Sequence, residues 1–216
     1  MTSQVQQIDA SAAEGGSSVR KMSEADVPAV VRLHQAAFSD NFMTTFGGRF
    51  LRAFYTGLIS HPDGYGCVAV DGADRTLGFC AGGTGSVQHI ARDMLRRRPL
   101  AFALPALLNV LRSPRRIGRM FQIARSYLGG SSDDTTAPSA ALLMQIAVAE
   151  ERRGSGAAQQ LVEQFLEEMR SRGATSVSLG VEPDNARAIA FYRRVGFKEV
   201  RVGVFEYALG AEMVER

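Results

Sequence analysis

The chain has 216 residues, of which 45% are hydrophobic and 22% are charged, and its formal net charge is +3. This composition excludes collagen-like, disulfide-scaffold and wholly disordered proteins, and the length suits one domain with an insertion and a full hydrophobic core. Because no uninterrupted apolar run reaches about 18 residues, we expect no membrane-spanning helix.

Residues 1–18 are expected to form a flexible tail, since they are rich in Ser, Gly, Ala and Gln. They contain neither the basic nor the apolar part of a secretory signal, so the sequence predicts a soluble, cytoplasmic protein whose domain spans 19–216. The two cysteines, Cys67 and Cys80, fit a reducing compartment.

The arginines are concentrated in one segment. Between Ile90 and Tyr127 the chain holds nine arginines and one acidic residue, Asp93, so this segment carries a net charge of +8 and the rest of the chain −5. The sequence therefore predicts a mildly acidic domain with a basic helical insert and a mobile polar loop over 90–138.

In the first half of the chain, the pattern predicts a strand over Ser17–Met22 and two amphipathic helices. The first helix begins at Ser23 or Asp26, and Pro28, which suits only a first turn, favours Asp26 as the N-cap. The second helix runs from about Gly48 to Ile59.

A hairpin follows, with two strand-like runs on either side of the turn sequence DGADR. The expected register places Val70 opposite Leu77 and Cys67 opposite Cys80. The two thiols are then expected to face each other in the core rather than to react.

The last third shows the strongest pattern, with a continuous apolar strand, a long amphipathic helix, a strand, a short helix and two closing strands. The predicted ranges are Ala141–Val148, 158–172, Ser176–Val181, Asn185–Tyr192, Lys198–Arg201 and Val204–Leu209. The whole order is β-α-α-β-β-(insert)-β-α-β-α-β-β, which indicates an α/β fold.

A glycine-containing loop joins the apolar strand to the long helix, with the sequence Arg153-Gly154-Ser155-Gly156-Ala157-Ala158. Glycines let a backbone approach a ligand closely, and a helix N-terminus adds unpaired N–H groups and a positive dipole end. The loop therefore indicates an anion site suited to a pyrophosphate. It lacks the Walker A sequence and the third glycine of a Rossmann fingerprint.

Two segments resemble the signatures of the GNAT family of N-acetyltransferases. The loop matches Arg/Gln-x-x-Gly-x-Gly/Ala, and NARAIAFYRRVGF, from Asn185 to Phe197, matches Asn-x-x-Ala-x-x-x-Tyr-x-x-x-Gly-Phe. The resemblance extends from roughly Val19 to Leu209 and implies acetyl-CoA as the acyl donor. It also implies a mixed central sheet flanked by helices, with the helical insert between the third and fourth strands.

The resemblance further implies the roles of particular residues. The backbone of the fourth strand and the loop would hold the cofactor, with Asn185 at the pantetheine arm and Tyr192 beside the thioester sulfur. The cofactor-binding residues expected on this ground are Ile146, Ala147, Val148, Arg153, Gly154, Ser155, Gly156, Ala157, Ala158, Asn185 and Tyr192. Tyr192 is also the expected catalytic residue, as general acid to the departing sulfur, while N–H groups near Ile146–Val148 polarise the carbonyl.

The general base cannot be identified from the sequence. Some members of the family carry a carboxylate early in the fourth strand, where this chain has Ser139–Leu143 and no acid. The alternatives are a chain of water molecules, an amine that arrives deprotonated, or a side chain among Asp40, Asp133, Asp134, His34 and His89. No metal site is expected, because the three histidines lack ligand spacing.

The expected reaction is transfer of an acetyl group to a primary amine of a small molecule or peptide. The runs LHQAAF and FGGRFLRAFYTGL resemble a bacterial subgroup associated with amino-sugar pathways, which makes an amino sugar one candidate.

The insert over 90–127 would act as a flap, as a site for an anionic acceptor or as a peripheral contact with an anionic membrane. Nucleic-acid binding is not expected, and a homodimer stays open. The alternative function is a non-catalytic acyl-CoA-binding regulator or membrane-surface module that uses the insert.

Overall fold

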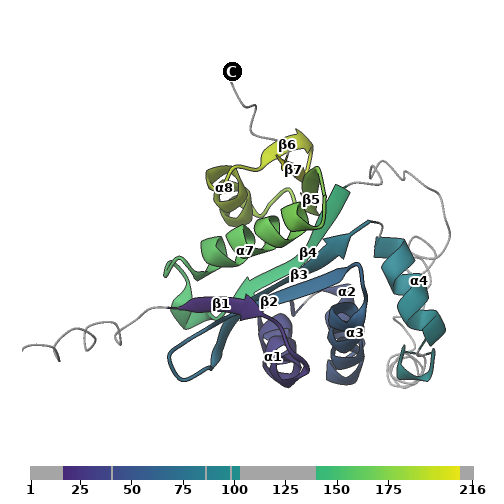
Figure 1. The fold of residues 1–216 in the computed structure, drawn as a ribbon. Helices are drawn as coiled ribbons and strands as arrows, with labels where there is room; N and C mark the ends of the chain where they lie inside the picture. The colour runs from purple at the N-terminus through teal and green to yellow at the C-terminus, as the bar shows by residue number, and fades with distance from the viewer. Residues whose placement is uncertain (1–16, 40, 86, 98, 103–139, 210–216) are drawn as a thin grey trace, which may run out of the picture.

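The computed structural model describes residues 17–39, 41–85, 87–97, 99–102 and 140–209. These residues form a mixed seven-stranded sheet in the order β1-β2-β3-β4-β5-β7-β6, in which only β4 and β5 are parallel (Figure 1). The strands span Ser18–Lys21, Gly64–Val70, Thr76–Thr84, Ala140–Val148, Ser176–Gly180, Lys198–Arg201 and Val204–Ala208, numbered β1 to β7 in that order. The predicted α/β class and the order of the predicted strands are confirmed.

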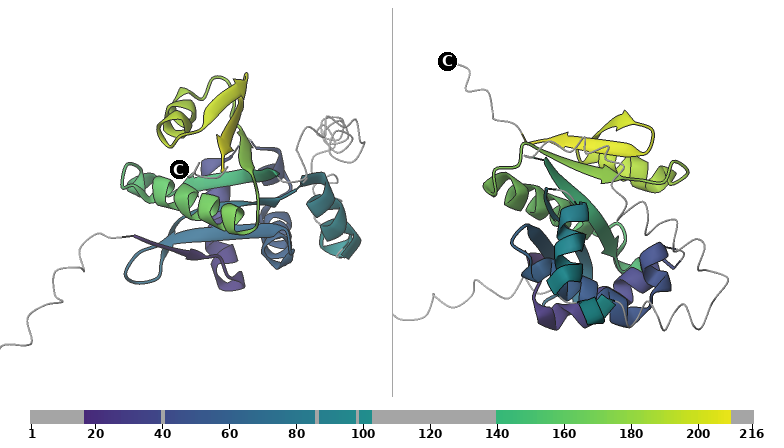
Figure 2. Two further views of the ribbon diagram at one scale, coloured as in Figure 1. Left: turned by 45° about the horizontal axis from the view of Figure 1, so that its top comes forward. Right: turned by 90° about the vertical axis from the view of Figure 1, so that its right-hand side faces the viewer.

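Helices cover both faces of the sheet (Figures 1 and 2). One face packs against α1 (Val27–Ala37), α3 (Gly48–Ser60) and α4 (Val87–Arg97), and the other against α7 (Ala157–Ser171) and α8 (Ala186–Arg194). Side chains of a strand alternate between its two faces. On β2, therefore, Cys67 and Ala69 belong to the core under α7, and Val68 and Val70 to the core over α1 and α3.

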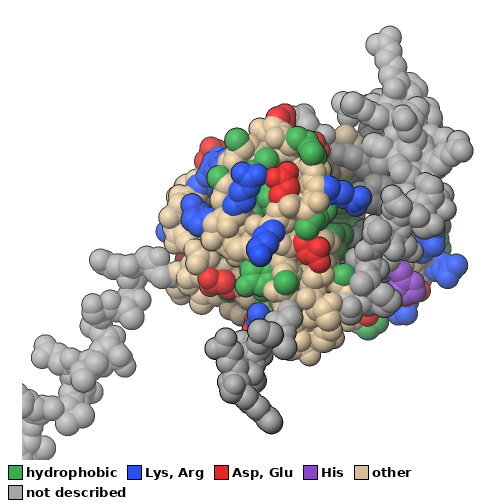
Figure 3. Space-filling view, turned by 90° about the horizontal axis from the view of Figure 1, so that it is seen from above, with side chains coloured by type: hydrophobic (Ala, Val, Ile, Leu, Met, Phe, Trp, Pro, Cys, Tyr) green, Lys and Arg blue, Asp and Glu red, His purple; other side chains and the backbone are tan. Residues whose placement is uncertain are grey.

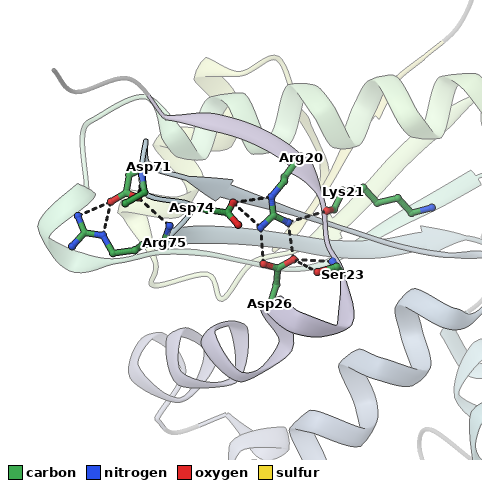
Figure 4. A network of polar contacts seen from close by, with 8 residues as sticks. Arg20, Lys21, Ser23, Asp26, Asp71, Asp74 and Arg75 are labelled. Atoms are coloured by element: carbon green, nitrogen blue, oxygen red, sulfur yellow. Dashed lines mark hydrogen bonds and ion pairs between the residues drawn. The ribbon is translucent and has the colours of Figure 1, made fainter. Parts of the chain in front are cut away.

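Both candidate N-caps are used at the start of α1. A 3-10 turn, Glu24–Asp26, precedes the helix, and the backbone N–H and hydroxyl of Ser23 both donate to the Asp26 carboxylate, at 2.8 and 2.7 Å. Asp26 is then the N-cap of α1, with Pro28 in its first turn. From β1, Arg20 donates two hydrogen bonds to the same carboxylate and also reaches Asp74 in the β2–β3 turn (Figure 4).

We predict that Asp26→Asn destabilises the protein most at neutral pH. Burial alone raises the pKa of the Asp26 carboxyl, but the hydrogen bonds from Arg20 and Ser23 outweigh it and lower the pKa from 3.8 to about 2. A pKa that is lower in the folded state gives stability that is present above pH 4 and is lost as the pH falls toward 2. The lowering of the Asp26 pKa corresponds to about 2 kcal/mol of the free energy of unfolding at neutral pH.

Urea unfolding of the wild type and the variant at pH 7 and at pH 2.5 measures this difference. The control is Asp74→Asn, which removes the exposed partner of the same Arg20 guanidinium and should cost less than about 1 kcal/mol. A destabilisation by Asp26→Asn that is equal at the two pH values would contradict the prediction.

The hairpin register is confirmed in part. Cys67 lies opposite Cys80 as predicted, but Val70 lies opposite Thr76 and not Leu77, because a bulge interrupts the ladder after Ala69. The side chain of Asp71 explains the difference. It accepts hydrogen bonds from the backbone N–H groups two and four residues further on and so closes a turn one residue shorter than expected.

The insert between β3 and β4 is described only at its beginning. Helix α4 buries Ile90 and Met94 against the core over α3, where Gly57 allows close approach of Met94. The predicted break near Arg112 and the mobile loop Gly129–Pro138 lie outside the described residues, as does the flexible tail up to residue 16. Among the helices that the structure describes, none is long and apolar enough to cross a bilayer.

The remaining helices lie close to their predicted ranges. Helix α3 begins at Gly48, α7 ends at Ser171 before Gly173, which has a φ of +78°, and α8 follows Asn185. A short helix, α2 (Phe42–Thr45), lies between α1 and α3 and was not predicted. At the corner between α1 and α2, Ala37, Phe38 and Asn41 line a cleft.

Candidate active site

A cleft opens where the two parallel strands of the sheet separate. β4 pairs with β5 only over Ala140–Leu142, opposite Ser176–Ser178. Beyond Leu142, the edge of β4 that turns toward β5 has no strand partner among the described residues. Residues 143–148 line a cleft of about 1240 Å³, and the end of β5, the start of α7 and one face of α8 complete its walls.

A bulge interrupts β4 beside this cleft. Ala81 pairs with Gln145 and the next residue of β3, Gly82, pairs with Leu143, so that Met144 is an extra residue in β4. Alternate residues of a regular strand point to opposite faces, and a bulge re-aims them. The bulge lies within the part of β4 that lines the cleft, where Met144 and Gln145 precede the predicted Ile146.

The glycine-containing loop forms the end of the cleft next to α7. Gly154 and Gly156 have φ values of +85° and +86°, in the left-handed region, and a Cβ atom added at either would meet no atom within 4 Å. Gly156 is the N-cap of α7, and it has no side chain to accept a hydrogen bond from the first turn. The Ala157 N–H donates to the Ser155 hydroxyl oxygen at 3.5 Å, and the other N–H groups of the first turn, with the positive helix end, remain available to an anion.

Arginine side chains add positive charge to this end. Arg152 and Arg153 line the cleft, and one guanidinium nitrogen of Arg153 lies 2.8 Å from a carboxylate oxygen of Glu150. Two predicted members of the loop do not line the cleft. The Ser155 hydroxyl donates to the carbonyl of Arg152, and Ala157 is buried under the loop.

Nine of the eleven predicted cofactor-binding residues thus line one cleft: Ile146, Ala147, Val148, Arg153, Gly154, Gly156, Ala158, Asn185 and Tyr192. Asn185 also acts as the N-cap of α8, because its side-chain oxygen accepts a hydrogen bond of 3.0 Å from the Ala188 N–H. This bond leaves the two hydrogens of its side-chain amide for a ligand.

Tyr192 lies at the inner wall, on the last turns of α8. Its ring packs against those of Phe191, Phe197 and Phe205, yet the residue lines the cleft and keeps 7% of its surface exposed. Burial raises the pKa of its phenol above the ordinary value of 10. The hydroxyl is therefore protonated at neutral pH and makes no hydrogen bond to another described residue.

The described candidates for a general base lie away from the cleft. His34 is fully buried, its Nδ1 is 2.7 Å from the Tyr55 hydroxyl, and burial lowers the pKa of its ring to about 4. His89 is exposed on α4 and does not line the cleft. Asp40, Asp133 and Asp134 lie outside the described residues. Nor do the described residues contain a cluster of metal ligands.

Four charged residues that line the cleft were not singled out from the sequence: Arg152, Glu182, Arg187 and Arg194. Arg187 and Arg194 are seven positions apart, a spacing that places two residues on one helix face and is a signal that the sequence did contain. For Glu182 there was no such signal, because its place depends on how far β5 diverges from β4.

Sequence comparison matches residues 115–197 to the acetyltransferase (GNAT) family. A mycothiol acetyltransferase from Saccharomonospora viridis is 44% identical over 59 residues, which cover 27% of this chain and 19% of that protein. N-alpha-acetyltransferase 30 from Schizosaccharomyces pombe is 44% identical over 45 residues, covering 21% and 30%. The matched segments thus span less than a third of these curated relatives.

Solved structures share the fold over nearly the whole chain. An N-acetyltransferase from Staphylococcus aureus has a TM-score of 0.57 at 15% identity and covers 90% of this chain and 99% of its own. A GNAT acetyltransferase from Brucella melitensis, in complex with acetyl-CoA, has a TM-score of 0.53 at 16% identity and covers 93% and 92%. The segment that matches the acetyltransferase (GNAT) family model, residues 115–197, contains both signatures that line the cleft.

Proposed function

We propose that this protein is an acetyl-CoA-dependent N-acetyltransferase that moves an acetyl group from the CoA thioester to a primary amine. The observation that carries the proposal is the convergence of three features on one cleft. These are the anion site at the start of α7, the unpaired edge of β4 and the protonated phenol of Tyr192.

The residues of the cleft fit the cofactor. Space beside Gly154 and Gly156, which any larger side chain would occupy, leads to the unpaired N–H groups of α7, and Arg152 and Arg153 add positive charge for the pyrophosphate. The backbone edge of β4 over Ile146–Val148 would pair with the amide groups of the pantetheine arm, and the amide of Asn185 would donate to the same arm.

The chemistry divides between the cofactor and the chain. The thioester supplies an activated acetyl group. N–H groups of β4 near Ile146–Val148 polarise its carbonyl, because donors fixed by the sheet need no reorganisation. As the neutral amine attacks the carbonyl carbon, the C–N bond forms and the C–S bond breaks. Tyr192 donates its phenolic proton to the leaving sulfur, since burial keeps that proton in place at neutral pH. The proton that the nitrogen releases passes to solvent water, and water reprotonates the phenolate.

The acceptor would enter from the wall formed by the corner between α1 and α2. Ala37, Phe38, Asn41 and Gln145 line this part and carry no charge. Among the described lining residues, Glu182 is the one carboxylate, and it would attract the ammonium form of an amine. The relatives named mycothiol acetyltransferase and N-alpha-acetyltransferase 30 support the acetyltransferase class. They do not select between a small molecule and a peptide.

Release of the CoA thiol from acetyl-CoA in the presence of spermidine, glucosamine or a peptide with a free N-terminus tests the proposal. We expect amine-dependent release with at least one of these acceptors, and formation of its amide by mass spectrometry. Binding of acetyl-CoA without transfer to any acceptor, in a broader panel of amines as well, would instead favour the non-catalytic regulator.

A further inference from the structure

Four arginines line the cleft from two directions. Arg152 and Arg153 belong to the loop before α7, whereas Arg187 and Arg194 stand on α8, across the cleft. Seven residues are close to two helical turns, so Arg187 and Arg194 lie on one face of α8. Figure 3, which views the molecule from above Figure 1, shows several basic side chains on this face with acidic ones among them.

Two of the three arginines of α8, Arg187 and Arg194, differ from their neighbours in their partners. Arg153 is paired with Glu150, and Arg193 is paired with Glu199 at 2.7 Å and does not line the cleft. Neither Arg187 nor Arg194 forms an ion pair with a described carboxylate. The Arg194 guanidinium instead lies 5.8 Å from the centre of the Phe191 ring, a cation–π contact that holds it beside the cleft wall.

Unpaired guanidinium groups in a cleft favour an anion, and their planar donors match phosphate oxygens. The loop and the start of α7 already account for one anionic group, the pyrophosphate. The other anionic group of CoA is the phosphate on the 3′ oxygen of its ribose. Its dianion would complement two arginines that no carboxylate neutralises, on a wall separate from the loop.

We propose that Arg187 and Arg194 form a subsite for the 3′-phosphate of CoA. The subsite selects free acetyl-CoA over donors that have the same pantetheine arm but no 3′-phosphate, such as 3′-dephospho-CoA or the phosphopantetheine arm of a carrier protein. This inference rests on the proposed function, because it takes CoA as the occupant of the cleft.

Calorimetric titration of CoA and of 3′-dephospho-CoA into the wild-type protein and into Arg187→Gln/Arg194→Gln tests the subsite without an acceptor. The wild type should bind CoA at least tenfold more tightly than 3′-dephospho-CoA. In the double variant, the affinities for the two ligands should differ by less than threefold. The preference of the wild type should also decrease as salt is added. Arg193→Gln is the matched control, because it removes the same charge from the same helix outside the cleft, and it should keep the wild-type ratio.

If the double variant is unstable, the single variants Arg187→Gln and Arg194→Gln replace it. Each single variant counts as folded if its melting temperature equals that of the wild type. Equal affinity of the wild type for the two ligands would overturn the subsite alone. So would a double variant that keeps the wild-type ratio. Failure of both ligands to bind the wild type would overturn the proposed function and the subsite with it.

Discussion

Gly156→Trp is expected to abolish the thermal stabilisation that acetyl-CoA gives to the wild-type protein. Acetyl-CoA at about 100 times its dissociation constant stabilises a protein by roughly 2.7 kcal/mol, which corresponds to roughly 5–10 °C for a domain of this size. The Cβ of residue 156 would project into open space at the end of the cleft. An indole at this position therefore fills the space of the pyrophosphate and covers the N–H groups of α7.

Gly173→Trp is the matched control. Gly173 follows the opposite end of α7, has a positive φ of +78° and has no atom within 4 Å of an added Cβ, but it does not line the cleft. The two variants thus carry a similar backbone strain, and differential scanning fluorimetry with and without acetyl-CoA separates strain from lost binding. If acetyl-CoA still raises the melting temperature of Gly156→Trp as it does that of the wild type, the loop is a structural turn and not the cofactor site.

Tyr192→Phe is expected to lower kcat at least tenfold and to leave the affinity for acetyl-CoA unchanged. The substitution keeps the ring that packs against Phe191, Phe197 and Phe205 and removes only the hydroxyl. General acid catalysis typically contributes a factor of about 100 to 10,000, so loss of the phenolic proton should affect turnover and not binding. Because burial raises the pKa of the phenol above 10, this group should cause no loss of activity below pH 10.

Steady-state kinetics with an acceptor found in the amine panel, together with calorimetric titration of acetyl-CoA, measures both quantities. The control is Tyr207→Phe, whose ring contacts Phe197 at a centroid distance of 5.3 Å and does not line the cleft. An unchanged kcat in Tyr192→Phe would exclude the hydroxyl as the general acid and leave the ring with a packing role.

Local signals account for most of the elements that were predicted correctly. Pro28 marks the first turn of α1, Gly173 and Gly196 follow the ends of α7 and α8, and the apolar run of β4 marks a strand covered on both faces. Such signals act through a few neighbouring residues, because they depend on φ preferences and on the periodicity of burial. They therefore locate elements without placing them relative to one another.

The two bulges, one in the β2–β3 hairpin and one in the β3–β4 pair, were not predicted. The turn at Asp71 closes through side-chain hydrogen bonds to its own backbone, which shifts Val70 onto Thr76 and leaves Leu77 as the extra residue. The bulge at Met144 likewise depends on the pairing of β4 with β3, and no property of residue 144 alone indicates it.

The sequence by itself determined the order of the strands and the loop from Arg153 to Ala158, because both depend on residue types at short, regular spacing. The choice of Tyr192 as the candidate acid came from the resemblance of Asn185–Phe197 to a family signature. Only the tertiary structure decided that β4 and β5 separate after Leu142, and that this separation forms the cleft. It also decided that Arg187, Arg194 and Glu182 line the cleft while His34 is buried against Tyr55. The physical reason is that exposure and proximity are set by packing between segments that lie far apart in the chain.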